Sequence, residues 1–204
     1  MKLAIMQPYF FPYIGYFQLM NAVDKFVVFD DIQYIRHGWI NRNRILSPNL
    51  EKEWQYFNVP LAKHSKKELI KNIKIVPTEE WKLFFIANLG YYKKIRAPYY
   101  NIVLDIVKEC IYFKTNYITE LNLHSLEIIT KFLNIQFDSV LSSTQDFNYN
   151  DVNHAGDWAF EISKQMNASV YINPIGGEEL FNRDKFINRH MKIKFIKSNT
   201  RKYK

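Results

Sequence analysis

The sequence predicts a parallel α/β fold with a helical subdomain in the middle of the chain, and three observations support this prediction. Residues 3–6 are a short apolar run typical of a buried strand, and residues 24–31 form a second apolar run rich in Val and Phe. Between them a helical apolar pattern begins at Ile14, which gives the strand, helix, strand order of a βαβ unit. Residues 79–137 then change to a helical pattern.

The segment between the βαβ unit and the helical stretch is harder to assign. Pro8 and Pro12 exclude a helix from the loop after the first strand. Residues 33–46 are polar and aromatic with little periodicity, whereas residues 53–61 alternate like a strand. Residues 63–76 form a basic stretch compatible with a short helix or strand.

The rest of the chain alternates between helical and strand patterns. Helices are expected at residues 79–95, 99–113 and 118–135, with breaks at Ala97-Pro98 and Thr115-Asn116. Beyond them we expect a strand at 139–143, an amphipathic helix at 156–168, a strand at 169–173, a turn at 174–177, a short helix at 178–182 and a closing strand at 193–196. No internal repeat or long linker is present. We therefore predict one α/β domain over residues 1–204 with an embedded helical subdomain at 79–137.

The composition is that of a globular protein that favours anionic partners. Hydrophobic residues make up 48% and charged residues 24% of the 204 residues, and the formal net charge is +8. Such a charge favours phosphates, nucleotides, nucleic acid or a membrane surface, although a solvated lysine-rich surface explains it more simply. Part of the charge lies in a basic tail at residues 192–204.

The cysteine content and the N-terminus indicate which classes of protein are not expected: disulfide-rich, cysteine–zinc, secreted or membrane-spanning. Cys110 stands alone in an apolar stretch, so we expect a buried thiol and neither a disulfide framework nor a cysteine zinc site. The N-terminus lacks the basic, apolar and cleavable regions of a signal peptide, and no apolar run approaches the ~18 residues of a membrane span. We therefore expect a cytoplasmic protein without an integral membrane segment, and the sequence leaves its oligomeric state open.

The first candidate binding segment is the loop QPYFFPYIGYF at residues 7–17. Ligands of parallel α/β sheets bind at the carboxyl ends of strands, near the helix N-termini that follow, and this loop has that position after the first strand. Its glycine permits close backbone approach, and its tyrosines place polar groups on stacking surfaces. Packing of a rigid aromatic loop explains any single ring about as well. The candidate substrate-binding residues here are Gln7, Tyr9, Tyr13, Gly15 and Tyr16.

The second candidate segment runs from Asp30 to Arg44. Asp30 and Asp31 end the second strand, and because successive strand side chains point in opposite directions, at most one should face a shared site. Arginine forks bind phosphate or carboxylate with two hydrogen bonds, and Asn and Trp suit contacts with a sugar or base. Three arginines and two asparagines lie within residues 36–44. Together they offer more hydrogen-bonding capacity than a solvated loop needs. Asp30 and Asp31 are therefore candidate catalytic residues, and the candidate substrate-binding residues are Gln33, Arg36, Trp39, Asn41, Arg42, Asn43 and Arg44.

A third group contains histidine. His64 is a candidate general base and Lys63 a candidate anion contact, although a histidine in a basic loop is more often a surface residue. His154 poses the same alternatives, and Asn173, at the end of an expected strand, is a further candidate substrate contact. The five histidines are scattered without HxH or HExxH spacing, so no metal site is expected.

Two segments resemble parts of nucleotidylyltransferases. LSSTQ at residues 141–145 resembles their ISST-type segment, and PYIGYF stands where those enzymes carry HxGH after the first strand. Tyr13 and Tyr16 replace both histidines, so the likeness concerns topology rather than activity. The expected architecture is thus a parallel Rossmann-like sheet with a nucleotidylyltransferase-like N-terminal βαβ unit. GxGxxG, P-loop and GxSxG motifs are absent, and the sequence identifies no cofactor.

Three longer segments are distinctive: MQPYFFPYIGYFQLM, DKFVVFDDIQYIRHGWINRNRI, and NVPL followed by Lys63-His64. They resemble the WbqC-like family of bacterial proteins. The similarity continues through the helical middle and VYINPIGGEELF, with departures mainly at residues 171–177, so it covers nearly the whole chain. The family's signature positions fall here on Gln7, Pro8, Tyr13, Gly15, Tyr16, Asp30, Asp31, Gln33, Trp39, Asn41, Arg42, Asn43, Arg44, Lys63 and His64.

The resemblance implies a transferase of surface-polysaccharide (O-antigen type) biosynthesis. It would transfer an acyl or aminoacyl group such as glycine to the amine of a nucleotide-linked or lipid-linked amino sugar. Its partner would be an anionic small molecule, either a nucleotide sugar or an activated acyl or aminoacyl donor. Arg42 and Arg44 would hold a phosphate or carboxylate, while Asp30 or His64 would deprotonate the amine.

Two other classes of function remain open at this point. A non-catalytic protein that binds a glycan or nucleotide sugar of the same pathway would use the same aromatic and amide-rich loops without a base. Nucleic acid as the primary ligand ranks last, because no RRM, helix-turn-helix or zinc-finger pattern is present and carboxylates lie in the expected site.

Overall fold

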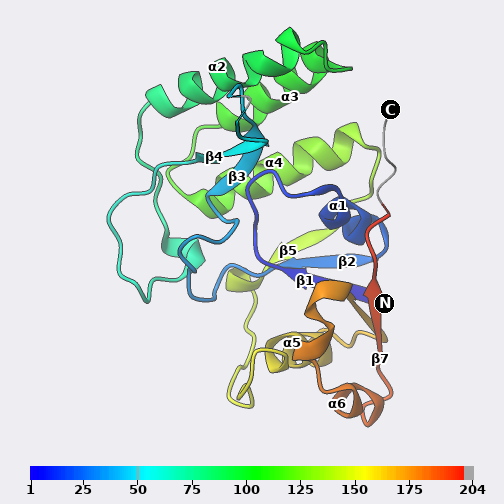
Figure 1. Ribbon diagram of the computed structural model, residues 1–204. Coiled ribbons are helices and arrows are strands. Elements are labelled where there is room, and N and C mark those ends of the chain that lie inside the picture. Colours follow the sequence, from blue (N-terminus) through cyan, green and yellow to red (C-terminus); the bar gives the residue numbers. More distant parts are fainter. Residues whose placement is uncertain (50, 200–204) are drawn as a thin grey trace. The chain divides into compact units, whose positions relative to one another are not determined.

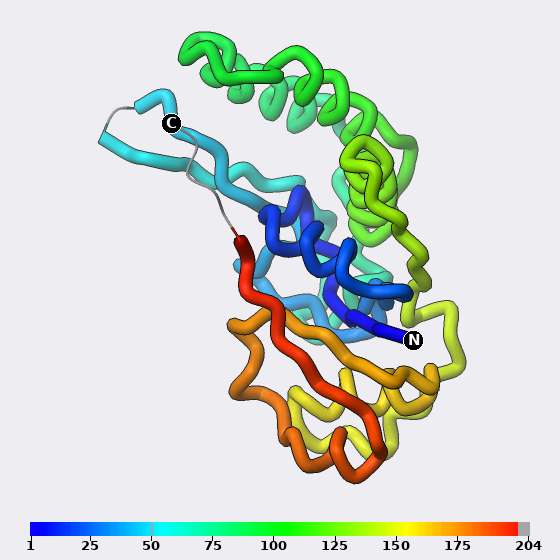
Figure 2. Tube along the Cα trace, turned by 90° about the vertical axis from the view of Figure 1, so that its right-hand side faces the viewer, coloured from blue at the N-terminus to red at the C-terminus, as the bar shows by residue number. Residues whose placement is uncertain are grey.

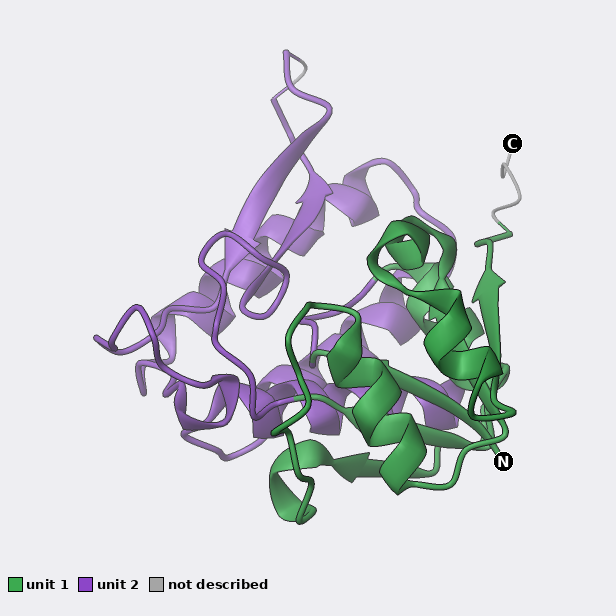
Figure 3. Ribbon diagram, turned by 90° about the horizontal axis from the view of Figure 1, so that it is seen from below, with its two compact units in different colours: residues 1–7, 13–29, 133–204 green, residues 8–12, 30–132 purple. Residues whose placement is uncertain are grey.

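The computed structural model describes residues 1–49 and 51–199 as a mixed α/β protein with a five-stranded parallel sheet (Figure 1). The last five residues of the basic tail lie outside the described part. The protein chain forms two compact units (Figure 3). Unit 1 comprises Met1–Gln7, Tyr13–Phe29 and Leu133–Lys204, and unit 2 comprises Pro8–Pro12 and Asp30–Phe132.

Unit 1 contains the parallel sheet, in the spatial order β5-β2-β1-β6-β7. Counted along the chain, this order places the third, second, first, fourth and fifth sheet strands side by side, so the winding direction reverses between β1 and β6. Figure 2 shows the last strand running beside β6, with which it pairs in parallel. The strands are β1 (Lys2–Met6), β2 (Lys25–Val28), β5 (Ser139–Leu141), β6 (Val170–Pro174) and β7 (Lys192–Ile196).

The helices of unit 1 confirm most of the sequence prediction. The first one begins at Ile14, as the apolar pattern predicted, and the amphipathic segment at 156–168 contains α5. The turn and short helix expected at 174–182 are instead one 3₁₀ helix, and α6 was not predicted; the Asn182 side chain caps it by accepting from the Asp184 amide at 3.0 Å. The helices are α1 (Ile14–Asn21), η2 (Ser142–Thr144), α5 (Asp157–Gln165), η3 (Ile175–Leu180) and α6 (Arg183–Ile187).

Unit 2 combines an antiparallel hairpin with the three predicted helices. The helix breaks fall where Ala97-Pro98 and Thr115-Asn116 predicted them, and β4 lies within the alternating segment 53–61. Its partner β3 was not predicted, because its sequence RNRIL has only one side chain, Ile45, that is buried in the core. The elements are β3 (Arg42–Leu46), β4 (Trp54–Asn58), η1 (Ile70–Asn72), α2 (Glu80–Lys94), α3 (Tyr100–Ile111) and α4 (Ile118–Phe132).

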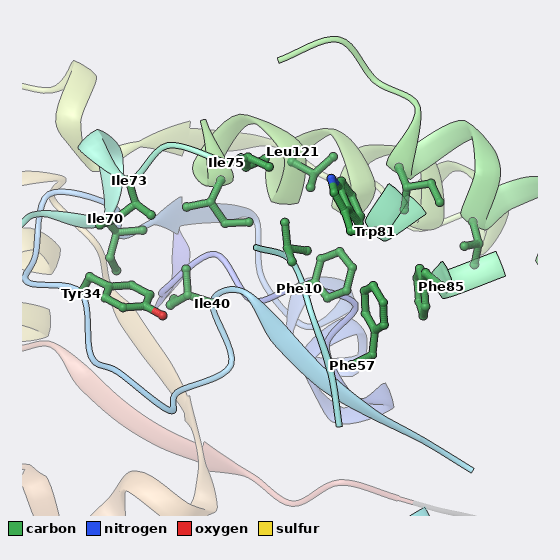
Figure 4. Close-up of a cluster of buried hydrophobic side chains, with 14 of the residues drawn as sticks. Phe10, Tyr34, Ile40, Phe57, Ile70, Ile73, Ile75, Trp81, Phe85 and Leu121 are labelled. Atoms are coloured by element: carbon green, nitrogen blue, oxygen red, sulfur yellow. The ribbon is translucent and has the colours of Figure 1, made fainter. Parts of the chain in front are cut away.

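The core of unit 2 is aromatic and includes part of the proline-rich loop. Phe10 is fully buried and lies beside Phe57 and Phe85, whose rings stack with centroids 3.9 Å apart (Figure 4). Residues 8–12 therefore belong to this core, while the sequence on either side of them belongs to unit 1. The single domain expected over residues 1–204, with an embedded helical subdomain at 79–137, stays a prediction.

Cys110 is buried, as the sequence predicted. Its Sγ lies 4.0 Å from the carbonyl oxygen of Ser125, and burial raises the thiol pKa to about 11. The thiol is therefore protonated at neutral pH and inaccessible as a nucleophile. Within residues 1–49 and 51–199, no helix is both long and apolar enough to cross a bilayer.

Candidate functional site

Side-chain amides hold the loop at residues 8–12 within unit 2. Asn122, which is fully buried on α4, donates from Nδ2 to the carbonyl oxygens of Pro8 at 2.8 Å and Ile40 at 2.7 Å. The amide of Phe10 donates to the carbonyl of Trp39 at 2.9 Å. Because the loop lacks regular secondary structure, these bonds satisfy backbone groups that burial would otherwise leave unpaired.

Asn43 fixes the next residues of the same loop. Its Nδ2 donates to the carbonyl oxygen of Phe10 at 3.0 Å and to that of Phe11. Phe11 has a φ of 44°, in the left-handed region that costs a bulky residue about 1–3 kcal/mol. Asn43 and Asn41 were predicted as substrate contacts, and that prediction is untested; in this structure Asn43 positions the strained loop.

The outer face of the hairpin carries the predicted arginines. Arg42 and Arg44 alternate along β3, so they share a face, and the register places Arg44 opposite Tyr56. The other face carries Ile45 and Phe57, which are buried in the core of unit 2. The arginine face therefore points away from that core.

The two guanidinium groups are clamped by aromatic rings. Arg42 lies 4.3 Å from the Tyr56 ring centroid and donates from Nε to the carbonyl of Gly38 at 3.0 Å. Arg44 lies 3.9 Å from the Trp54 centroid and donates to the Tyr56 hydroxyl at 3.3 Å, a hydrogen bond that lowers the Tyr56 pKa. Arg42 also donates from a terminal nitrogen to the carbonyl of His37, and within the described chain no carboxylate lies within 4.0 Å of either guanidinium.

His64 has a fixed tautomer. Its Nδ1 lies 2.8 Å from the carbonyl oxygen of Ala62, and because a carbonyl only accepts, Nδ1 carries the hydrogen in that contact. In the neutral imidazole Nε2 then holds the lone pair. Nε2 is buried and has no hydrogen-bond partner within residues 1–49 and 51–199. An unsatisfied buried acceptor of this kind calls for an explanation in structure or function.

Tyr34 links His64 to the arginine segment. Its ring packs edge-on against His64 with centroids 5.1 Å apart, and its hydroxyl donates to Oδ1 of Asn41 at 2.7 Å. Asn41 in turn donates to the carbonyl of Val59 at 2.9 Å, so both ends of its amide are engaged. Burial raises the Tyr34 pKa, and the charges of Arg42 and Arg36 partly oppose this. Tyr34 therefore stays a neutral donor in a network that reaches from His64 to the arginines.

The remaining unit 2 candidates differ in exposure. Asp30 is buried at 1% exposure, while Asp31 is half-buried; that at most one of them faces a shared site stays a prediction. Tyr9 packs against the core, and Gln33 is exposed and donates to the carbonyl of Lys66 at 3.0 Å. Arg36 and Lys63 are also exposed.

In unit 1 the predicted loop residues pack against one another. The buried Tyr16 donates from its hydroxyl to the carbonyl of Gln7 at 2.8 Å, just after β1. A Cβ added at Gly15 would lie 2.4 Å from the Tyr13 ring and 2.8 Å from Oγ of Ser198. Gly15 thus allows close packing of protein groups here, and its role in substrate binding stays a prediction.

Asn173 and His154 also lie in unit 1, at separate places. Asn173 accepts from the Tyr171 hydroxyl at 2.8 Å and donates to the carbonyl of Pro174 at 2.9 Å, so its amide is engaged within the protein. The His154 side chain is exposed, and its backbone amide donates to Oδ2 of Asp157 at 3.0 Å.

Asp157 ties the start of α5 to α6 through an ion pair with Lys185, which lowers the Asp157 pKa despite burial. A lowered folded-state pKa contributes stability that is present above the unfolded pKa and lost as pH falls through the folded value. We expect Asp157→Asn to cost about 2 kcal/mol at pH 7, and the difference from wild type to shrink only as pH falls below the unfolded value of about 3.9 and to vanish below the lowered folded value. Urea unfolding at several pH values measures this, and a difference that does not shrink between pH 4 and pH 2 would contradict it.

The sequence did not indicate three side chains that contact Arg42, Arg44 or His64 in unit 2: Trp54, Tyr56 and Tyr34. Trp54 and Tyr56 were contained in a correctly predicted strand, whose alternation places them on one face; that signal was available. Tyr34 had no such signal, since its role depends on contacts with His64 and Asn41 that only the fold creates. No group of three or more His, Cys, Asp or Glu side chains suited to a metal ion occurs within the described residues.

Comparisons with known proteins locate the chain in one family. An uncharacterised protein of Mycobacterium tuberculosis (strain ATCC 25618 / H37Rv), Rv1507c, is 42% identical over 60 residues, which is 29% of this chain and 25% of the relative. The match therefore spans about a quarter of that relative's length. No solved structure matches significantly. The WbqC-like family profile matches residues 7–204, and the chain therefore belongs to the WbqC-like protein family.

Proposed function

We propose that the protein is a cytoplasmic transferase of surface-polysaccharide biosynthesis that acylates the amine of a nucleotide-linked or lipid-linked amino sugar. The transferred group is an acyl or aminoacyl group such as glycyl. Family membership supports the proposal, and the strand order of unit 1 supports a Rossmann-like relationship, since doubly wound sheets also reverse direction beside their first strand.

The observation that carries the proposal is the state of His64. An ammonium group is not nucleophilic, so amide formation near neutral pH requires a base that removes a proton from the amine. Nε2 of His64 offers a lone pair with its tautomer fixed from the other side of the ring by Ala62. The surrounding segment consists of isolated bridges and one 3₁₀ turn, and the proposed reaction requires a local movement there that uncovers Nε2.

The reaction that fits these groups is direct transfer. The amine nitrogen attacks the acyl carbon, and Nε2 of His64 accepts the amine proton. The bond between the acyl carbon and the donor's leaving group breaks, and the leaving group departs with the electron pair. A covalent intermediate on Cys110 is disfavoured because its thiol is buried and protonated. Arg42 and Arg44 hold a phosphate or carboxylate of the substrate on the hairpin face, where their forks have no competing carboxylate within the described chain.

Replacing Arg42 by alanine should lower kcat/KM by about 10- to 150-fold, because a hydrogen bond to a charged group of the substrate is worth about 1.5–3 kcal/mol. The folded state should persist, since Arg42 lies on the outer face of β3. Product formation is followed by the mass of amino-sugar acceptors incubated with activated acyl and aminoacyl donors. Arg42→Lys keeps the charge without the fork and should recover only part of the loss. Wild-type turnover in Arg42→Ala would overturn the assignment.

A binding protein without catalysis is the second candidate, and one observation favours it. The aromatic and guanidinium groups of the hairpin are exposed and clamped in place, as in a surface that recognises a ligand without transforming it. Such a protein would bind a nucleotide-linked amino sugar with equal affinity in wild type and His64→Gln, and neither would change the acceptor's mass. A mass gain that depends on wild-type protein excludes this alternative.

A further inference from the structure

The turn between α2 and α3 has a composition that the proposed transfer reaction does not use. Residues 81–104 contain Lys82, Lys93, Lys94 and Arg96 and no Asp or Glu. Lys93, Lys94 and Arg96 are exposed at the turn itself, where α2 and α3 lie side by side (Figure 1). The turn at residues 93–103 therefore carries three exposed cations and no carboxylate, and the exposed Asp105 follows it on α3.

The same turn exposes large apolar side chains. Ile95 is 46%, Tyr99 76%, Ile102 49% and Val103 47% exposed. Single exposed apolar residues are normal, but four within nine residues form a patch. An open depression of about 440 Å³ lies at this patch, lined in part by Arg96, Tyr99 and Ile102.

The backbone at the turn is strained at two residues. Arg96 and Tyr99 have φ values of 54° and 62°, a left-handed conformation that non-glycine residues adopt rarely and at a cost in free energy. Pro98 lies between them and cannot continue either helix. Such strain is concentrated at functional segments, which is a reason to ask what this one contacts.

We propose that the α2–α3 turn, residues 93–103, docks the protein onto the surface of an anionic phospholipid bilayer. Cations that flank exposed apolar and aromatic side chains are the composition of interfacial membrane contacts, in which the side chains enter the headgroup region and the charges meet anionic lipids. The patch is also too small to span the bilayer, so the contact is peripheral. This inference does not rest on the proposed transferase activity.

Other occupants fit the turn less well. Three of the four exposed apolar residues, Ile95, Ile102 and Val103, are aliphatic, and single-stranded nucleic acid is bound mainly by aromatic stacking. A second copy of the chain would bring the same cluster of three cations against itself, which repels. A bilayer accepts the aliphatic side chains and the cations together.

Vesicle co-sedimentation of the full chain tests the proposal. The protein should sediment with phosphatidylglycerol–phosphatidylcholine vesicles, bind phosphatidylcholine vesicles much less, and be released by high salt. Lys93→Gln/Lys94→Gln should weaken partitioning about 25-fold, at about 1 kcal/mol per cation. Lys66→Gln/Lys67→Gln removes the same charge from another exposed lysine pair and should change partitioning much less.

The apolar part of the contact has its own matched variants. Ile102→Ser/Val103→Ser should lower partitioning at least tenfold, whereas Ile187→Ser, at a still more exposed site on α6, should leave it unchanged. Circular dichroism of each variant monitors folding, and sedimentation equilibrium monitors self-association. Equal losses in both lysine pairs would show a net-charge effect and overturn the assignment to this turn. Absence of vesicle binding would also overturn the proposal, as would self-association that Ile102→Ser/Val103→Ser abolishes.

Discussion

Replacing His64 by glutamine is expected to lower kcat/KM for amide formation by about 100- to 10,000-fold, the usual contribution of a positioned general base. Glutamine retains a side chain of similar size and can still donate to the carbonyl of Ala62, but it cannot accept a proton from the amine. Binding of the amino-sugar substrate should change little, so the loss should fall on kcat rather than on KM.

His124→Gln is the matched control for that experiment. His124 also lies in unit 2, on α4, and stacks on Phe113 with ring centroids 4.1 Å apart, so both substitutions remove an imidazole that packs against an aromatic ring. The two variants should have similar thermal unfolding midpoints, and only His64→Gln should lose activity. Equal activities in both variants would remove His64 from the reaction.

Replacing Gly156 by alanine is expected to destabilise unit 1 by about 3 kcal/mol, at the upper end of the usual cost of overpacking. A Cβ at this position would lie 2.1 Å from the carbonyl oxygen of Leu180 and 3.3 Å from Cα of Phe181. Both contacts are with backbone, which cannot move aside as a flexible side chain would. Relief of the clash would require displacement of α5 or of the end of η3.

Gly90→Ala provides a control of opposite sign. Gly90 lies inside α2, and an added Cβ would meet nothing within 4 Å. Alanine there should stabilise the protein by about 0.5–1 kcal/mol, because it removes the conformational freedom of glycine in a helix interior. Urea unfolding of both variants measures the pair. A Gly156→Ala protein as stable as wild type would show that the close approach to Leu180 does not exist in solution.

Secondary structure was predictable from sequence where a hydrophobic pattern determined it. The strand at 3–6, the helix from Ile14 and the three helices between 79 and 137 all follow from apolar periodicity and proline breaks. β3 was missed because one of its faces is made of arginines stacked on aromatic rings, which have no apolar alternation. α6 was missed because five residues give too short a pattern for periodicity to appear.

The candidate site was predictable in residue type but not in role. Arg42, Arg44 and His64 could be selected because their chemistry suits anion binding and proton transfer. The amides of Asn41, Asn43 and Asn173 could not be assigned in the same way, since a side chain that holds the backbone and one that holds a substrate look alike in a sequence. Likewise, the assignment of Phe10 to the core of unit 2 depends on long-range contacts that local patterns do not contain.

The central claim is that His64 serves as the base in acylation of an amino sugar, and chemical rescue tests it most directly. The measurement is the mass of a nucleotide-linked amino-sugar acceptor after incubation with an activated donor and the His64→Ala variant, with and without added imidazole. We predict no mass gain without imidazole, and a gain of one acyl or aminoacyl group whose rate increases with imidazole concentration. A full mass gain in His64→Ala without imidazole, or a wild-type protein that never changes the acceptor's mass with any activated donor, would contradict the account.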